Sequence, residues 1–484
     1  MRFLLPILLL SSCTVRIPTQ YDVANGAVKI FPDYTEITIP NNIAPLNFRI
    51  EMQADEFITQ ITDSYGQTYL YTGSVVTIGE GDWAKILKAS QSYSIDIYSR
   101  RGDKWTKYPT VRNCIDSSRI DGYITYRLIE PSYVVWKSMG LYERNLTNFD
   151  ERPLLHSPLT TDNQCMNCHT PQNNDGGNRY MFHIRGKSGG GTIIADGDKI
   201  EKLNLKTDKV ISGGVYPAFH PIKKEIAFSV NDIGQLFHTQ LDKKVEVMDF
   251  QSDIMLYDID KHTVTPLTNE FNKLYTFPAW SADGEYLYFC VADAPTENKN
   301  DEQERFMDLY RRYREFQYSL CRGRVVNNRL TDIDTIFSRP SSSVSFPRAS
   351  ADGRYLMFTL SDWGNFSIWH PEADLWITDL STMESAPLEG ANSEQTESFH
   401  SFSSGDAGWF VFSSRREDGN YTRLYISKLY NGKATKPFII PQSSPDFYDG
   451  FFKSYNVPEL SRSAVRYSAR EMGEVAQQDA INVK

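Results

Sequence analysis

The chain has 484 residues, which is too long for one ordinary hydrophobic core, so we expect two or three domains or one large repeat domain with an addition. It is rich in Tyr and Phe, with 28 and 27 residues, and both residue types favour β-strands. The formal net charge of −10 offers no basic surface to DNA or RNA, which argues against a nucleic-acid partner.

The first residues have the pattern of an export signal. An apolar run from Phe3 to Leu10 follows Arg2 and is too short to cross a bilayer as a helix. Small residues then precede Cys13, as in a lipoprotein signal, in which residues 1–12 are removed and Cys13 receives a lipid. We therefore expect a bacterial envelope protein anchored in a membrane, with the outer membrane and the periplasmic side favoured. A plain secretory signal or a buried apolar run is the alternative.

A small β domain is expected after a linker at residues 13–29. Within 30–117, the segments 48–52 and 93–98 alternate apolar and polar residues at period two, and turn residues separate such runs. Several short strands with regular turns indicate a β-sandwich-like domain of immunoglobulin-like type. No chemistry stands out there.

An internal repeat occupies the remainder of the chain. Its clear copies open with an aromatic residue and are followed by an apolar strand, a third strand and a short fourth one. The openings are Tyr216-Pro217-Ala218-Phe219-His220-Pro221, Phe277-Pro278-Ala279-Trp280-Ser281-Ala282-Asp283-Gly284, Phe346-Pro347-Arg348-Ala349-Ser350-Ala351-Asp352-Gly353 and the divergent Phe399-His400-Ser401-Phe402-Ser403. Weaker copies are expected in 123–155 and 179–210.

The repeat unit predicts a four-stranded antiparallel blade. Asp-Gly at 283–284 and 352–353 suits the tight hairpin between the first two strands. One blade cannot bury both of its faces, so we expect a closed β-propeller at 118–455, with six blades, and a loosely packed tail at 456–484. The repeats resemble those of the TolB family and related WD-like propellers, which implies a propeller but says little about activity.

One insertion, residues 301–316, has apolar residues at helical spacing, including Phe306 and Leu309. We expect an amphipathic helix against the rim of the propeller, with a partner-docking helix as the alternative. Cys290 and Cys321 lie in neighbouring strand-like runs, where either a disulfide or two buried free thiols is expected.

The segment Cys165-Met166-Asn167-Cys168-His169 matches the attachment signature of a c-type haem. Two thiols three residues apart reach the vinyl groups of the porphyrin, and His169 ligates the iron. Loop-forming residues flank the motif, so we expect a haem loop at 156–178. A zinc site would need two further ligands, and a thioredoxin-like pair would need a βαβ unit. An inert or disulfide-bonded pair remains an alternative.

The sequence does not identify the sixth ligand of the iron. Met181 and His183 lie on one face of the next predicted strand, and connections at the same mouth of the propeller add further candidates. These further candidates are His238, in the link 230–253, His370, His400 and, for contacts at the rim or to the haem propionates, Arg415, Arg416 and Arg423. Taken singly, each histidine suits a hydrogen-bonded loop residue and the arginines suit salt bridges.

Three functions are compatible with these patterns. The leading hypothesis is periplasmic electron transfer, in which the tethered haem exchanges electrons with a redox partner protein or envelope complex. The second is a haem oxidoreductase with an open iron position, for which nothing identifies a substrate. The third is a non-catalytic TolB-like scaffold that binds a protein.

Overall fold

The computed structural model describes residues 15–89, 91–130, 138–187, 189–239, 243–296 and 301–484. That part of the chain consists mainly of strands and contains three α-helices, so the predicted all-β class is confirmed. Cys13 and the expected export signal lie outside the described residues. Within them, no helix has the length and apolar character needed to cross a bilayer. The described residues form two compact units, one within residues 15–37, 45–115 and 441–447, the other within residues 38–44, 116–440 and 448–484.

The first unit contains two sheets and one helix. The larger sheet runs β1–β9–β8–β10, and β5 joins it to β6. Its strands are β1 (Asp22–Val23), β5 (Glu56–Asp63), β6 (Thr68–Thr72), β8 (Ser92–Arg101), β9 (Lys104–Lys107) and β10 (Val111–Asp116). The smaller sheet has β2 (Ile30–Phe31), β4 (Phe48–Ile50) and β7 (Val75–Val76), and the helix is α1 (Glu80–Ala89). The alternation seen in the sequence is realised in β8, whose buried residues alternate along most of the strand.

The second unit is a succession of mainly antiparallel sheets of about four strands, and its residues include the short strand β3 (Thr38–Pro40). The first two sheets are β13 (Glu151–His156), β12 (Gly140–Asn145), β11 (Tyr123–Ile129) and β35 (Ser454–Ser461), then β14 (Cys165–Pro171), β15 (Arg179–Arg185), β16 (Gly191–Asp196), β17 (Lys199–Asn204) and β36 (Ile481–Asn482). The next are β18 (Val215–Phe219), β19 (Glu225–Phe237), β20 (Val245–Asp258) and β21 (Thr263–Pro266), then β22 (Lys273–Trp280), β23 (Leu287–Asp293), β24 (Ser319–Val326) and β25 (Arg329–Phe337). The last are β26 (Ser343–Ala349), β27 (Tyr355–Ser361), β28 (Asp374–Asp379) and β29 (Glu384–Pro387), then β30 (Glu397–Phe402), β31 (Trp409–Ser414), β32 (Arg423–Tyr430), β33 (Lys433–Ala434) and β34 (Phe438–Ile439).

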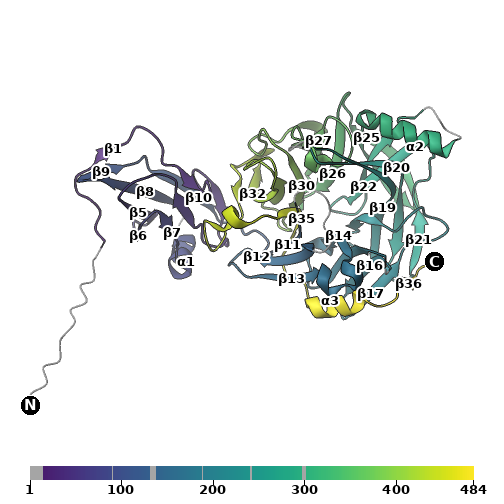
Figure 1. The fold of residues 1–484 in the computed structure, drawn as a ribbon. Helices are drawn as coiled ribbons and strands as arrows, with labels where there is room; N and C mark the ends of the chain where they lie inside the picture. Colours follow the sequence, from purple (N-terminus) through teal and green to yellow (C-terminus); the bar gives the residue numbers. More distant parts are fainter. Residues whose placement is uncertain (1–14, 90, 131–137, 188, 240–242, 297–300) are drawn as a thin grey trace, which may run out of the picture. The chain divides into compact units, whose positions relative to one another are not determined.

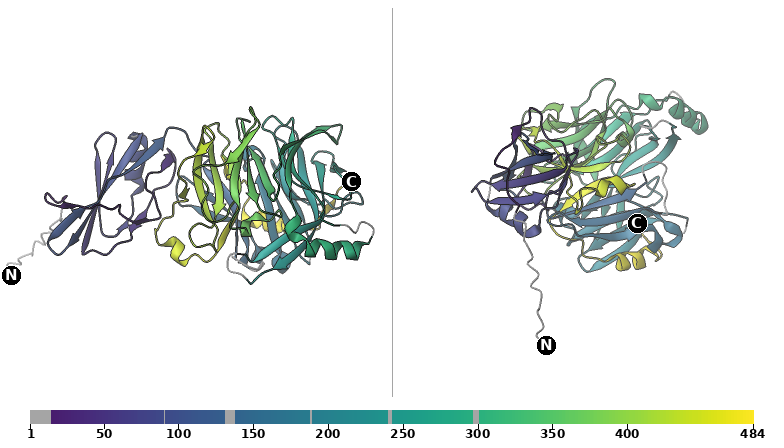
Figure 2. Two further views of the ribbon diagram at one scale, coloured as in Figure 1. Left: turned by 90° about the horizontal axis from the view of Figure 1, so that it is seen from above. Right: turned by 60° about the vertical axis from the view of Figure 1, so that its left-hand side comes forward.

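These sheets are arranged around an axis (Figures 1 and 2). The strands β14, β18, β22, β26, β30 and β35, here called the inner strands, contact one another in that order, and β35 contacts β14 again. Each sheet buries its faces against its neighbours, as the apolar clusters shared between successive sheets show. A circle of radially arranged sheets is the β-propeller architecture.

The end of the chain closes this circle. Strand β35 pairs antiparallel with β11, from Tyr123 opposite Ser461 to Ile129 opposite Ser454, and lies beside β30 (Figure 1). Helix α3 (Ala469–Ala476) follows, and its residue Met472 is fully buried. Strand β36 then adds a parallel strand to β17. The predicted loose tail at 456–484 is therefore wrong, because these residues supply ladder hydrogen bonds and apolar surface that their mostly polar composition hides.

Two further boundaries need correction. The second sheet begins at Cys165 instead of residue 179, and the predicted link 230–253 is mostly a long hairpin, in which β19 and β20 pair from Glu225 opposite Asp258 to Phe237 opposite Val245. The predicted hairpin at 283–284 is confirmed, since Gly284 has φ of 75° and its N–H donates to the Ser281 carbonyl at 2.9 Å.

The predicted helix is present as α2 (Glu302–Arg311), which Asp301 caps. Leu309 is fully buried, and the Phe306 ring stacks on Phe250 of β20 with centroids 4.6 Å apart. Cys290 and Cys321 are free buried thiols. The disulfide alternative is wrong because Cys290 lies opposite Leu320, one residue out of register with Cys321, so the two thiols enter different apolar clusters.

Candidate functional site

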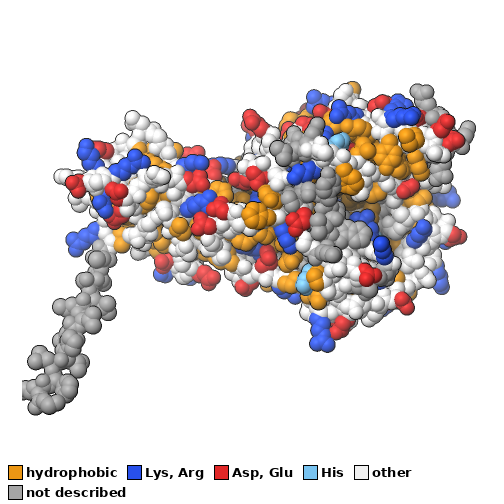
Figure 3. Space-filling view, in the orientation of Figure 1, with side chains coloured by type: hydrophobic (Ala, Val, Ile, Leu, Met, Phe, Trp, Pro, Cys, Tyr) orange, Lys and Arg blue, Asp and Glu red, His pale blue; other side chains and the backbone are white. Residues whose placement is uncertain are grey.

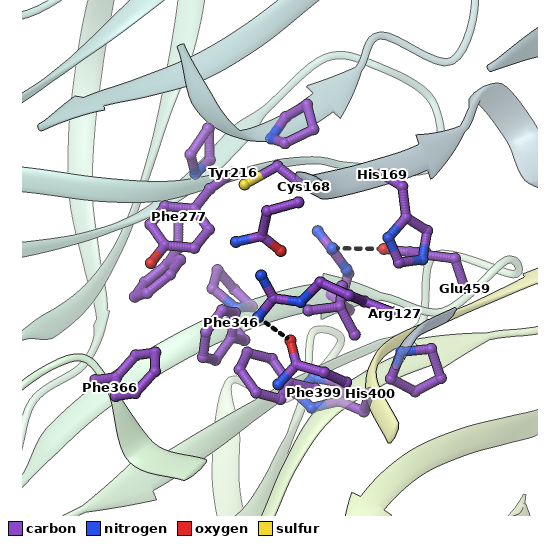
Figure 4. Close-up of a pocket in the computed structure, with 18 residues that line it drawn as sticks. Arg127, Cys168, His169, Tyr216, Phe277, Phe346, Phe366, Phe399, His400 and Glu459 are labelled. Atoms are coloured by element: carbon purple, nitrogen blue, oxygen red, sulfur yellow. Dashed lines mark hydrogen bonds and ion pairs between the residues drawn. The ribbon is translucent and has the colours of Figure 1, made fainter. Parts of the chain in front are cut away.

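The inner strands share a backbone irregularity that shapes the centre of the ring. Each contains one non-glycine residue with positive φ, between 45° and 55°, at a point where the pairing register shifts. These bulge residues are Cys168, Tyr216, Phe277, Phe346, Phe399 and Val457. A bulge releases one residue from the ladder and redirects its side chain. All six line one central cavity, together with the residue that follows each of them (Figure 4).

Four of the bulge residues are aromatic and pack on one another. The ring centroids of Tyr216 and Phe277 are 4.5 Å apart, those of Phe277 and Phe346 4.1 Å, and those of Phe346 and Phe399 4.5 Å. Together they form an apolar wall on one side of the cavity. The remaining bulge residues, Cys168 and Val457, complete the circle where β14 and β35 meet.

The haem-attachment motif occupies the inner strand β14, so the predicted loop at 156–178 is wrong for the motif itself. Cys165 pairs with Arg185 and Asn167 with His183 on β15, whereas Thr170 pairs with Met181. Cys168 and His169 fall in the bulge between these pairs and have no cross-strand partner in the ladder. The flanking polar residues indicated a loop, but the motif carries the bulge of a blade's first strand.

His169 is buried with both ring nitrogens bare. Its side chain lies in the cavity wall at 1% exposure, and among the described residues neither Nδ1 nor Nε2 has a hydrogen-bond partner. Burial lowers the pKa of His169 to about 3, although the backbone of Thr125 and Val457 acts to raise it. A neutral imidazole with free ring nitrogens inside a protein is the state in which histidine binds metals.

The two thiols of the motif are buried near two guanidinium groups. Arg185 Nη2 lies 4.0 Å from Cys165 Sγ, and Arg127 interacts electrostatically with both Cys165 and Cys168. Burial raises the pKa of the Cys168 thiol, while the two arginines act to lower it. A buried thiol is inert toward large reagents, so any chemistry at these sulfurs in the closed fold is restricted.

The donor set fits a c-type haem. Two thiols and an adjacent imidazole with bare nitrogens are the groups that such a haem requires. Cys168 and His169 line the central cavity, whereas Cys165 does not. The cavity beside His169 has only about 50 Å³ that water can enter, enough for a few water molecules. A porphyrin at this motif would therefore need the surrounding side chains to lie further apart than they do here.

His400 lies in the wall of the same cavity, in the position after bulge residue Phe399. Its Nε2 lies 3.1 Å from the Met357 carbonyl, Nδ1 has no hydrogen-bond partner among the described residues, and burial lowers its pKa to about 3. The structure thus brings His400 and the motif to one cavity. The dashed line to Glu459 in Figure 4 marks its ion pair with Arg348, at 3.0 Å.

Met181 and His183 lie on β15, beside the motif. Met181 is fully buried in an apolar cluster with Phe228 and Met255. His183 Nδ1 lies 3.2 Å from Thr192 Oγ1, and burial lowers the pKa of His183 to about 3. Neither residue lines the central cavity.

The other two predicted histidines also lie outside the cavity wall. His238 is half-buried in the short link after β19, with its ring 6.2 Å from that of Tyr313. His370 is fully buried between two carboxylates, with Nε2 at 3.0 Å from Glu246 and Nδ1 at 2.9 Å from Glu372. His238 and His370 therefore do not share the wall of the central cavity with the motif, although His370 is held to the β19–β20 hairpin through Glu246.

The three predicted arginines have structural partners. Arg416 pairs with buried Glu397 at 3.0 Å. Arg423 donates to the carbonyls of Lys453 and Phe451 at 2.7 and 3.0 Å. The Arg415 guanidinium lies 3.0 Å from the centre of the Trp369 ring. None of them lines the cavity. On the face of this unit shown in Figure 3, acidic and basic side chains are interspersed.

Sequence reasoning missed most of the cavity wall. The aromatic-proline pairs were recognised as blade openings but not as lining residues, and Cys168-His169 was not recognised as a further copy of that pair. Val457-Pro458 carries no aromatic signal, and Arg127 is an ordinary strand residue in the sequence. The sequence did contain one usable signal: Cys168-His169 aligns with Tyr216-Pro217, and this alignment would have placed the motif at the bulge of an inner strand.

No protein-family model matches this sequence, and no curated protein is significantly similar to it. Among solved structures, the chain is similar to a prolyl endopeptidase, with 12% identity over 66% of this chain and 42% of that one and a TM-score of 0.37. It is also similar to the tricorn protease, with 11% identity over 82% and 43% and a TM-score of 0.37. An oligogalacturonate lyase in complex with manganese has 10% identity over 84% and 98% and a TM-score of 0.35. This chain spans less than half the length of the first two proteins.

Proposed function

We propose that this chain is an envelope-anchored β-propeller that carries one covalent c-type haem and exchanges electrons with a partner protein. The observation that carries the proposal is His169, a buried imidazole with two bare ring nitrogens, directly following Cys168 and three residues after Cys165 in the attachment sequence. A solvent-exposed or fully hydrogen-bonded histidine would give no such indication.

In this proposal, Cys165 and Cys168 hold the haem covalently and His169 ligates its iron. When bound, the haem supplies a one-electron couple whose potential depends on the axial ligands and on burial. The chain's own residues limit the access of water to the site, because the aromatic bulge residues close one side of it. Arg127 and Arg185 add positive charge beside the thiols, and this charge would stabilise the reduced state of the haem, which carries one more electron.

The buried thiols restrict the order of events. Cys165 and Cys168 are 3% and 6% exposed, so a porphyrin cannot reach them once the ring has closed. Attachment would precede the pairing of β35 with β11. Folded haem-free protein is expected to stay colourless when haem and a thiol reductant are added, whereas protein made alongside a haem-ligation system takes up colour.

We also propose that the ring has six blades, because six inner strands contact one another in a closed circle. Its repeats resemble those of TolB-like propellers. A lipid on Cys13 would hold it in the envelope on the periplasmic side. The proposal leaves the redox partner to be identified.

The experiment is to produce the full chain with and without a haem-ligation system and to measure the haem that survives acid extraction. We expect attached haem in the first preparation and its loss in Cys165→Ser and Cys168→Ser. Cys114→Ser is the matched control, since Cys114 is an exposed free thiol outside the motif. Colourless protein from the first preparation would contradict the proposal and leave the protein-binding scaffold.

The spectrum of the same preparation separates the two haem functions. A low-spin spectrum that carbon monoxide does not change supports electron transfer. A high-spin spectrum that carbon monoxide changes supports an oxidoreductase with an open iron position. Replacing His183 or His400 by Gln then tests each as the sixth ligand, since loss of that ligand converts a low-spin spectrum to a high-spin one.

A further inference from the structure

The central cavity contains a buried cation with no anionic partner. Arg127, on β11, is 8% exposed. Its Nη2 donates to Asn456 Oδ1 at 3.0 Å, its Nη1 reaches the Met166 carbonyl only at 3.5 Å, and its Nε has no hydrogen-bond partner among the described residues. Across the described part of the chain, no carboxylate oxygen lies within 4.0 Å of its guanidinium nitrogens, so Arg127 forms no ion pair.

The other charges in the cavity wall cancel. Arg348 pairs with Glu459 at 3.0 Å, and both line the cavity, so one guanidinium remains uncompensated. Burial lowers the pKa of Arg127, which reflects the unfavourable surroundings of its charge. A buried charge without a partner typically costs several kcal/mol, and a native protein usually supplies a counter-charge.

Three more side chains present bare polar atoms in the same wall. They are Asn167 with Oδ1, His400 with Nδ1 and His169 with both ring nitrogens. All three residues are part of inner strands, and the two histidines are at most 3% exposed. Several unsatisfied polar atoms around one enclosed space indicate an occupant that the protein's own groups do not replace.

The space limits what that occupant is. About 50 Å³ accommodates a few water molecules or one ion of one to three heavy atoms with a bridging water, but no nucleotide, sugar or peptide. Water alone would satisfy hydrogen bonds but would leave the Arg127 charge uncompensated. A small monovalent anion does both, because it accepts from Arg127 and a bridging water can donate to Asn167 or His400.

We propose that the central cavity binds one small monovalent anion, of the chloride, nitrite or formate class, against the Arg127 guanidinium. The site goes beyond the haem function, and its evidence is independent of that function, since Arg127 lacks an anionic partner among the described residues of the haem-free fold.

The test uses bromide as an anomalous scatterer. Crystals of the full chain, prepared with and without a haem-ligation system, are soaked in sodium bromide, and calorimetric titrations with chloride, nitrite, formate and sulfate follow in solution. We expect an anomalous peak within hydrogen-bond distance of Arg127 in at least the haem-free preparation. We also expect sulfate to bind at least tenfold more weakly than chloride, because the cavity is small.

Variants assign the binding to Arg127. We expect Arg127→Gln to weaken chloride binding at least tenfold, which is about 1.4 kcal/mol, and Arg127→Lys to retain part of it. Arg423→Gln is the matched control, since Arg423 is also buried but donates to backbone carbonyls away from the cavity, and it should bind chloride as the wild type does.

The outcomes are distinct from those of the haem experiment. An empty or water-filled cavity in both preparations, or bromide found only at the iron, overturns the anion site whatever the colour of the protein. Colourless protein with bromide at Arg127 contradicts the haem and supports the anion site. If Arg127→Gln does not fold, the wild-type peak and the Arg127→Lys titration still decide.

Discussion

The positive φ of the bulge residues predicts an inverted order of two substitutions at Phe346. Its side chain packs on Phe277 and Phe399, so Phe346→Ala removes a nearly buried ring and should lower the free energy of unfolding by about 3–5 kcal/mol. Glycine usually costs a further 0.5–1 kcal/mol, approximately, relative to alanine within a strand. At φ of 53°, however, alanine bears a left-handed penalty of roughly 1–2 kcal/mol that glycine avoids.

We therefore expect Phe346→Gly to be at least as stable as Phe346→Ala, and more stable by up to roughly 1.5 kcal/mol. The matched control is Phe358, a buried residue of β27 in the same sheet with ordinary strand geometry, where glycine should be the less stable of the two. Urea unfolding of the full chain, followed by tryptophan fluorescence, measures all four variants. The same alanine-over-glycine preference at both positions would refute the argument.

Three further predictions concern titration and packing. Burial opposes protonation of His370, but its two carboxylate partners raise its pKa, so its contribution to stability is full below pH ~6.5 and is lost as pH rises through the raised pKa. The midpoint of urea unfolding should therefore fall with rising pH on the alkaline side, and His370→Gln should make that fall smaller. Burial lowers the pKa values of His169, His183 and His400 to about 3, so these histidines are neutral in the folded protein, and unfolding at pH 5 should bind about three protons through them. His400→Gln should reduce this proton uptake by about one, as measured by calorimetry in buffers of different ionisation enthalpy. Leu309→Ala should lower the free energy of unfolding by about 2–5 kcal/mol, whereas exposed Met307→Ala should stay within about 0.5 kcal/mol; equal losses would show that α2 does not pack as described.

Much of the strand pattern could be predicted because it rests on local signals. The Asp-Gly turns, the apolar second strands and the helical spacing of Phe306 and Leu309 each act within a few residues. The closing strand could not be predicted in this way. Its residues, such as Asn456 and Glu459, are polar, and only their pairing with β11 at the other end of the ring gives them a place in a sheet.

The candidate site could be predicted only in its chemistry. The attachment sequence identified Cys165, Cys168 and His169 by residue type and spacing. It did not predict that they form an inner strand, because the surrounding polar residues are equally suited to a loop. Arg127 could not be identified as a site residue for a different reason. Its importance comes from its burial and from the lack of an anionic partner, and both are properties of the closed ring.

The pairing of Tyr123 with Ser461 has a consequence for biosynthesis. These partners are more than 300 residues apart, so the ribosome needs on the order of tens of seconds between making one and making the other. During that interval β11 has an unpaired edge of the kind that invites aggregation. A product truncated anywhere before β35 would keep that edge permanently, so incomplete molecules are expected to aggregate more readily than the full chain.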